Sequence, residues 1–137
     1  MRTNELELEA RAENLPEVQS FVEERLEDAG CPMKAQMQIG VAVEEVFVNI
    51  ASYAYAPEIG NATVRVEVSD DPVTVTITFV DHGVPYDPLA KDDPDVTAMA
   101  QERKIGGLGI FLTKQVMDEV RYEYRDGQNV LTMKKLL

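Results

Sequence analysis

The sequence has little of what covalent or metal cross-links require: its 137 residues include one cysteine, one histidine and no tryptophan. Cys31 is the single cysteine, so an internal disulfide is excluded, and one histidine cannot complete a structural zinc site with it. No run approaches the roughly 18 apolar residues of a membrane-spanning helix, and the first residues have no apolar core like that of a signal peptide. We therefore expect a soluble, cytoplasmic protein in which Cys31 is a small buried apolar residue.

Basic residues are also scarce, with 13 Lys and Arg against 25 Asp and Glu and a net charge of −12. Nucleic acids and anionic membranes bind basic surfaces, so this balance argues against both as partners. A hydrophobic content of 45% excludes a disordered acidic chain. The length predicts a single domain spanning residues 1–137. A small anionic ligand held by backbone and metal, or a basic protein partner, stays compatible with the charge.

The first part of the chain predicts one strand and two helices. Hydropathy alternates with a period of two over residues 5–10, which indicates a strand with one apolar face. Asn14 is typical of the N-cap of a helix that ends at Gly30. A second, longer helix is expected from about residue 32 to about residue 55.

The second part returns to strands. Residues 62–68 and 73–79 alternate with a period of two and predict an antiparallel pair. An irregular segment over residues 81–105 has a length that is usually functional. A helix over about 107–118 and a hairpin over 120–133 with an Asp-Gly turn follow. We expect an α+β fold, a two-layer sandwich whose mainly antiparallel mixed sheet is covered on one face by three helices.

The longer helix carries two polar residues opposite its apolar stripe. The stripe consists of Ile39, Val43, Phe47, Ile50 and Ala54. Glu45 and Asn49 are four positions apart and share one ridge, where most neighbours are apolar. One interpretation is a buried polar network or a half-solvated face. The other is a ligand pocket, in which Glu45 could orient or deprotonate a hydroxyl and Asn49 could bind a cation such as Mg²⁺.

A polar residue also ends the second strand of the antiparallel pair. Asp81 keeps the odd-numbered register of Ile77 and Phe79, so its carboxylate should face the core. Gly83 permits close approach of a flat ligand, and an adenine ring would offer its exocyclic amino group to Asp81. The alternative is a turn in which the Asp81 side chain bonds its own backbone. His82 has the opposite parity and is expected at the rim.

Glycines cluster where the last helix begins, in the run Gly106, Gly107, Leu108, Gly109 and Ile110. Backbone N–H groups at such a helix start suit phosphate, and Arg103 and Lys104 just upstream fit the same purpose. The spacing is neither that of a P-loop nor that of a Rossmann fingerprint. By itself, the glycine cluster is weak evidence for a nucleotide site.

Taken in order, these elements resemble the GHKL ATP-binding fold shared by gyrase-type ATPases, sensor histidine kinases and bacterial anti-sigma factor kinases. Residues 45–49 resemble the N box, residues 81–85 the first glycine box and residues 107–109 the second. The resemblance covers nearly the whole chain. Within this superfamily, the segments around Tyr86 and Met117 are most similar to those of the bacterial anti-sigma factor serine/threonine kinases.

The resemblance implies roles for the residues of these boxes. Asn49 would ligate Mg²⁺, Asp81 would hold the adenine amino group beside Gly83, and Glu45 would be the base that activates a serine hydroxyl. An ATP lid would span about residues 84–105. Contacts to the nucleotide near its phosphates would come from Lys104, Gly106, Gly107, Leu108, Gly109 and Ile110.

The function implied by the resemblance is an ATP- and Mg²⁺-dependent serine/threonine protein kinase that is also an anti-sigma factor. Its partners would be a sigma factor and an anti-anti-sigma protein as substrate, and such proteins are commonly homodimers. The alternative is an adenine-nucleotide-dependent regulatory protein without significant kinase activity. Glu45 favours the kinase, because a pure binder needs no carboxylate near a transferring phosphate. Many members carry a histidine where this chain has Tyr53.

Overall fold

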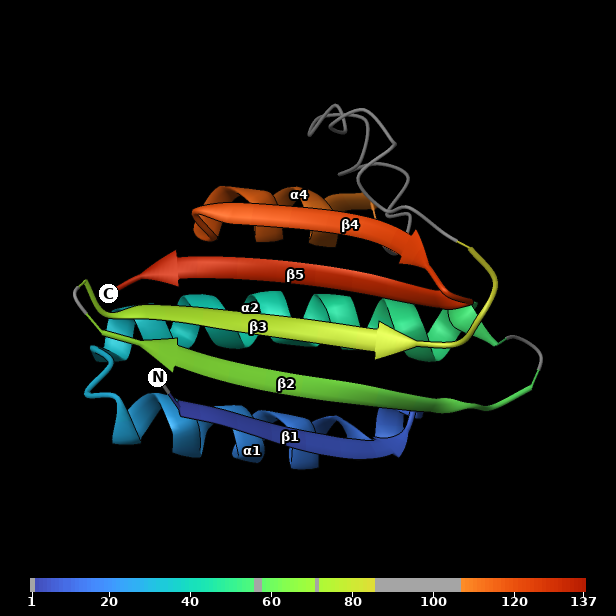
Figure 1. Cartoon of the computed structure of the whole chain (residues 1–137), viewed down its shortest axis with the longest axis horizontal. Coiled ribbons are helices and arrows are strands. Elements are labelled where there is room, and N and C mark those ends of the chain that lie inside the picture. Colours follow the sequence, from blue (N-terminus) through green and yellow to red (C-terminus); the bar gives the residue numbers. More distant parts are fainter. Residues whose placement is uncertain (1, 56–57, 71, 86–106) are drawn as a thin grey trace.

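The computed structural model describes residues 2–55, 58–70, 72–85 and 107–137, which form a sheet with a row of helices on one of its faces (Figure 1). The strands follow the order β1-β2-β3-β5-β4. They are β1 (Arg2–Glu9), β2 (Asn61–Ser69), β3 (Thr74–Asp81), β4 (Glu119–Arg125) and β5 (Gln128–Leu136). The helices are α1 (Leu15–Asp28), α2 (Met33–Asn49) and α4 (Gly107–Val116), with the short turns η1 (Ala12–Asn14) and η2 (Ile50–Ala54).

This arrangement confirms the predicted α+β two-layer sandwich with three helices on one face. The sequence predicts a mainly antiparallel mixed sheet, and all four ladders between the described strands are antiparallel. The predicted final hairpin is present, and Asp126 and Gly127 at its turn have φ of 54° and 76°. Two consecutive positive φ values suit the tight turn of a twisted hairpin. None of the helices among the described residues is long and apolar enough to cross a membrane.

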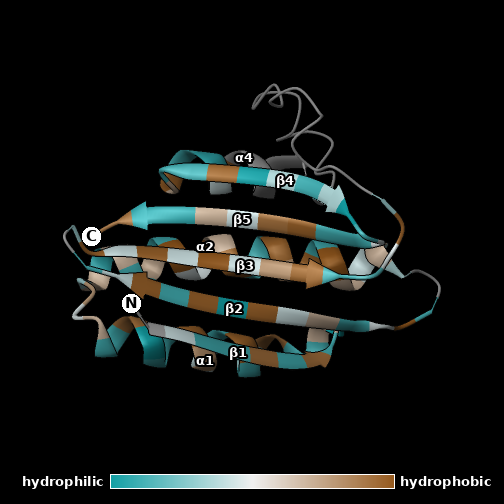
Figure 2. Ribbon diagram, viewed as in Figure 1, coloured by the Kyte–Doolittle hydropathy of each residue, from teal (hydrophilic) through white to brown (hydrophobic). Residues whose placement is uncertain are grey.

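Alternation along the strands places the core between the two layers. Figure 2 shows apolar and polar residues alternating along β2. Val64 lies opposite Phe79 and Val66 opposite Ile77, and all four side chains are buried. Successive side chains of a strand point to opposite faces, so these residues form the face that the helices cover.

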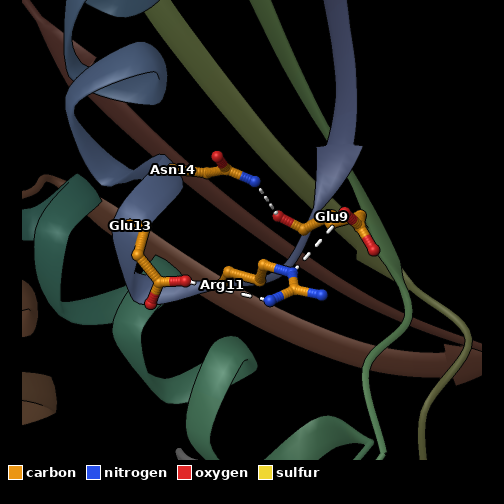
Figure 3. A network of polar contacts seen from close by, with 4 residues as sticks. All are labelled: Glu9, Arg11, Glu13 and Asn14. Atoms are coloured by element: carbon orange, nitrogen blue, oxygen red, sulfur yellow. Dashed lines mark hydrogen bonds and ion pairs between the residues drawn. The ribbon is translucent and has the colours of Figure 1, made fainter.

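Helix α1 ends as predicted but begins differently. Gly30 follows its last turn with φ of +73°, a conformation that favours glycine. Asn14 stands at the N-cap position, yet its side chain makes no capping hydrogen bond. Instead its Nδ2 donates to the Glu9 carbonyl at 2.9 Å, in a polar cluster where Arg11 pairs with Glu9 and Glu13 (Figure 3). Because η1 intervenes, Asn14 joins the end of β1 to the start of α1.

Helix α2 is the centre of the helical layer and continues into η2, a π-helical turn, as far as Ala54. Every residue of the predicted apolar stripe is buried, from Ile39 to Ala54. Cys31, just before the helix, is also buried, and burial raises the pKa of its thiol. A π turn within a helix widens it locally and often occurs at functional sites. Here the turn begins directly after Asn49.

Candidate active site

A small cavity of about 40 Å³ lies where the end of α2 and its π turn face the ends of β3 and β5. Its walls are mainly apolar, with polar side chains at Asn49, Asp81 and Asn129. The remaining lining residues are Val46, Ile50, Tyr53, Ala54, Phe79, Val84, Tyr122 and Leu131. An apolar cavity with a few converging polar groups is typical of a small-molecule site. The pairing of β3 with β5 brings Asp81 and Asn129, which are far apart in the sequence, to the same wall of the cavity.

Asp81 lies on the core side of the sheet, as its register predicts, and is 4% exposed. Its Oδ1 accepts hydrogen bonds from the backbone N–H of Gly83 and from Nδ2 of Asn129, both at 2.9 Å. The bond from Gly83 is the local turn that the sequence allows as an alternative, so one carboxylate oxygen has that structural role. The described residues donate no hydrogen bond to Oδ2. As far as the described residues go, this second oxygen can accept a hydrogen bond from a ligand that carries a donor.

Asn129 was not identified from the sequence, although it organises this corner of the cavity. Its Nδ2 donates to Asp81 and to the carbonyl of Val84 at 2.8 Å, and its Oδ1 accepts from the hydroxyl of Tyr122. Asn129 pairs with Asp81 across the β3–β5 ladder. The available signal was parity, because Asn129 precedes Leu131 on the core-facing side of β5. Asn129 also follows an Asp-Gly turn closely, in a region where asparagine is common for local reasons.

Gly83 packs directly against the π turn. A Cβ atom at this position would lie 2.1 Å from the carbonyl oxygen of Ala54, and the next N–H, of Val84, donates to that same oxygen at 2.9 Å. The sequence predicts that glycine is needed here for a ligand to approach. The structure provides a different reason for glycine, which is close contact between the strand end and the helix end.

Replacing Gly83 with alanine is therefore expected to lower the free energy of unfolding by about 3 kcal/mol, because the added methyl group overlaps backbone that cannot move aside. Urea denaturation measures the effect. Gly40→Ala is the matched control: a Cβ there would meet Gln19 at an ordinary 3.7 Å, and alanine favours the helix by about 0.5–1 kcal/mol. Equal stability of the Gly83 variant and the wild type would contradict the packing described.

Tyr55, directly after the π turn, also stabilises this end of the cavity. Its hydroxyl donates to the carbonyl of Asn61 at 2.6 Å and accepts from the N–H of His82 at 2.7 Å. The residue after the π turn is thereby connected to the start of β2 and the end of β3. Burial raises the pKa of the Tyr55 hydroxyl, which keeps it protonated as the donor that this arrangement requires. His82 is exposed at the rim, as its parity predicts.

Of the polar pair predicted on α2, Asn49 lines the cavity and Glu45 does not. Asn49 is 8% exposed and lines the cavity, and its buried Nδ2 has no hydrogen-bond partner among the described residues. Glu45, one turn earlier, is half-buried and does not line the cavity. Burial raises the pKa of the Glu45 carboxyl, and the neighbouring charge of Glu44 raises it further. A buried amide without a partner is costly and is explained most simply by a ligand that supplies one.

The glycine-rich segment is only partly described. The backbone of Gly107, Leu108, Gly109 and Ile110 forms the first turn of α4, where the sequence predicts a helix start. Helix α4 packs against α2. Lys104 and Gly106, and the predicted lid apart from Val84 and Pro85, lie outside the described residues.

A magnesium ion would not be held here by protein ligands alone. The described residues contain no group of three or more His, Cys, Asp or Glu side chains that could hold a metal. Mg²⁺ commonly keeps several waters and binds through one or two protein oxygens together with substrate phosphates. One buried amide at Asn49, whose oxygen and nitrogen exchange places by a simple side-chain flip, fits that mode. The donor set is compatible with Mg²⁺ that arrives with a nucleotide.

The fold and this cavity together define a class of protein, and comparison with known families agrees. A family model described as "Histidine kinase-like ATPase domain" matches residues 8–135, and the chain belongs to this family. Similar curated proteins are bacterial kinases. A serine-protein kinase RsbW of Listeria monocytogenes is 31% identical over 111 residues, which cover 77% of this chain and 69% of that protein.

Two further relatives are also serine or serine/threonine protein kinases. A serine/threonine-protein kinase BtrW of Bordetella bronchiseptica is 27% identical over 101 residues, covering 73% of this chain and 70% of that protein. A serine-protein kinase RsbW of Bacillus cereus is 28% identical over 98 residues, covering 69% and 60%. These matches confirm the resemblance to bacterial anti-sigma factor serine/threonine kinases and the predicted class of enzyme, a serine/threonine protein kinase.

Proposed function

We propose that this chain binds ATP with Mg²⁺, phosphorylates a serine of an anti-anti-sigma protein and sequesters a sigma factor. The observation that carries the proposal is the fixed carboxylate of Asp81, buried in an apolar cavity with one oxygen held by Gly83 and Asn129. The family match makes ATP the expected nucleotide. The names of the relatives support a protein substrate.

In the proposed complex the adenine ring enters the cavity and donates its amino group to Oδ2 of Asp81. Asn129 and Gly83 donate to Oδ1, so they fix the carboxylate in the orientation that presents Oδ2. The apolar walls exclude water, which strengthens this hydrogen bond. Gly83 lies beside the ring and shapes the entrance through its contact with Ala54.

At the phosphate end, Asn49 contributes an amide to the metal and nucleotide. A Mg²⁺ ion bound here with the nucleotide would neutralise charge on the transferring phosphoryl group. Helix α4 packs against α2, and the N–H groups at the start of α4 suit the phosphates, with Gly107 and Gly109 allowing close approach. Leu108 and Ile110 belong to the same turn, and Lys104 and Gly106 precede it in the chain.

Glu45 is the proposed general base. It lies one helical turn before Asn49 on the same ridge, so a hydroxyl placed beside the phosphate end of the site comes within its reach. The carboxylate accepts the proton of the serine hydroxyl as the serine oxygen bonds to the γ-phosphorus, while the bond from that phosphorus to the bridging oxygen breaks and ADP leaves. Partial burial and the charge of Glu44 favour proton acceptance, because both raise its pKa.

The proposal extends to assembly and location. As a cytoplasmic regulator, the chain would act as a homodimer and exchange a sigma factor for its substrate. The strand β1 ends the sheet and presents an edge. The regulatory alternative, nucleotide binding without kinase activity, leaves the charge of Glu45 beside the phosphate end unexplained.

Transfer of labelled γ-phosphate tests the proposal. The wild-type chain is incubated with ATP, Mg²⁺ and a purified anti-anti-sigma domain, and the modified residue is located by mass spectrometry. Phosphate on one serine, abolished when that serine is replaced by alanine, is the expected result. Nucleotide binding without transfer to any such domain would favour the regulatory alternative.

A further inference from the structure

The solvent side of α2 differs from that of its neighbour α1. Most exposed residues on α1 are acidic: Glu17, Glu23, Glu24, Glu27 and Asp28. On α2, one exposed ridge is apolar, with Met33, Met37 and Val41 exposed by 68%, 67% and 41%. The other exposed residues of α2 are the charged Lys34 and Glu44. Isolated apolar residues are common on surfaces, but three at successive four-residue steps form a continuous strip on a helix.

This strip leads to the proposed base. The next steps of four along the same ridge are Glu45 and Asn49. With a rise of about 1.5 Å per residue, Val41 lies about 6 Å and Met33 about 18 Å from Glu45 along the helix axis. A folded protein that brings a serine hydroxyl to Glu45 therefore covers the strip as well.

Gly40 marks the edge of this strip on the side of α1. It is half-buried, and its carbonyl accepts a hydrogen bond from Nε2 of Gln19 at 3.3 Å. A Cβ atom added at Gly40 would face Gln19 as well, at an ordinary distance of 3.7 Å, so a methyl group there does not enter the strip.

We propose that Met33, Met37 and Val41, called the methionine strip, form the docking surface for the protein substrate. This inference rests on the proposed function. The partner would present an apolar patch beside its phosphorylatable serine, with basic residues on the side that faces the acidic surface of α1. Methionine suits such a surface because its flexible side chain adapts to its partner. A second copy of this chain seated here would cover the approach to Glu45, so the strip fits a substrate better than a dimer contact.

The test compares transfer kinetics of Met33→Gln/Met37→Gln with the wild type, using the anti-anti-sigma domain that the wild type phosphorylates. The KM for this domain should rise about 10-fold, with kcat and the KM for ATP nearly unchanged. Gly40→Ala on the same helix should leave this KM nearly unchanged, because the added methyl group would face Gln19 of α1 and not the strip. Leu136→Gln is the matched control, because Leu136 is 55% exposed at the end of β5 and lies outside the strip.

The outcomes separate the possibilities. An unchanged KM in the strip variants, with active wild type, would overturn the docking surface and leave the kinase proposal standing. Absence of transfer by the wild type would count against the kinase and the docking surface together. Sedimentation velocity without substrate tests whether a second copy of this chain occupies the strip. If the wild type is a dimer and the double variant is a monomer, the strip is a dimer contact and the docking proposal is wrong.

Discussion

Asp81→Asn is expected to weaken ATP binding by at least about 100-fold while leaving the fold intact. The two side chains have nearly the same shape, and the hydrogen bonds from Gly83 and Asn129 to Oδ1 would hold the oxygen of the new amide in place. Its NH₂ group would then occupy the position of Oδ2 and face the amino group of adenine. Two opposed donors replace a charged hydrogen bond, a change of about 3 kcal/mol.

Calorimetric titration with ATP and Mg²⁺ measures this loss. Asp118→Asn is the matched control, since Asp118 accepts a hydrogen bond from the N–H of Leu136 and does not line the cavity. Its ATP affinity should equal that of the wild type. Unchanged affinity in Asp81→Asn, with a normal melting temperature, would remove Asp81 from the binding site.

Glu45→Gln is expected to reduce phosphate transfer by about 10²- to 10⁴-fold, the usual contribution of a general base, with ATP affinity changed by less than about twofold. The amide keeps the size and polarity of the side chain but accepts no proton. Single-turnover transfer of labelled phosphate measures the first quantity and calorimetry the second. Transfer at the wild-type rate would exclude Glu45 as the base.

The pH dependence of transfer gives an independent test of Glu45. Its pKa is raised, first by burial and then by Glu44, so the rate should fall on the acid side at a higher pH than an exposed glutamate would give. Glu44→Gln removes one cause and should move this limb to lower pH. The free energy of unfolding should depend on pH in the opposite direction to the transfer rate. Ionisation of Glu45 costs more in the folded state, so the free energy of unfolding falls as pH rises through the folded pKa. Glu45→Gln should abolish that fall. An acid limb unmoved by Glu44→Gln would contradict the assignment.

Local pattern was enough to predict the fold. Period-two hydropathy identifies the strands, and the buried stripe from Ile39 to Ala54 identifies the inner face of α2. The parity of Asp81 with Ile77 and Phe79 correctly places its carboxylate at the core side. Each of these inferences uses neighbours within one element, where the spacing of side chains is fixed by helix or strand geometry.

What the sequence did not show depends on contacts between distant elements. Asn129 reaches Asp81 only because β5 pairs with β3 in a particular register, which neither segment encodes alone. The steric reason for Gly83 lies in the carbonyl of Ala54, almost 30 residues earlier. Tyr55 has one residue of β2 and one after β3 as partners for the same reason. The π turn is a single turn at the end of α2, too short to be recognised from a repeating hydropathy pattern.

The most direct measurement of the central claim compares the affinities of the wild-type chain for ATP and for inosine triphosphate, each with Mg²⁺. The two nucleotides share sugar and phosphates, and inosine has a carbonyl where adenine has its amino group, so contacts at the phosphate end cancel. If the carboxylate of Asp81 selects adenine, ATP should bind at least about 10-fold more tightly, because inosine would place an acceptor against Oδ2. Equal affinities, or no detectable binding of ATP, would contradict the nucleotide site described for this chain.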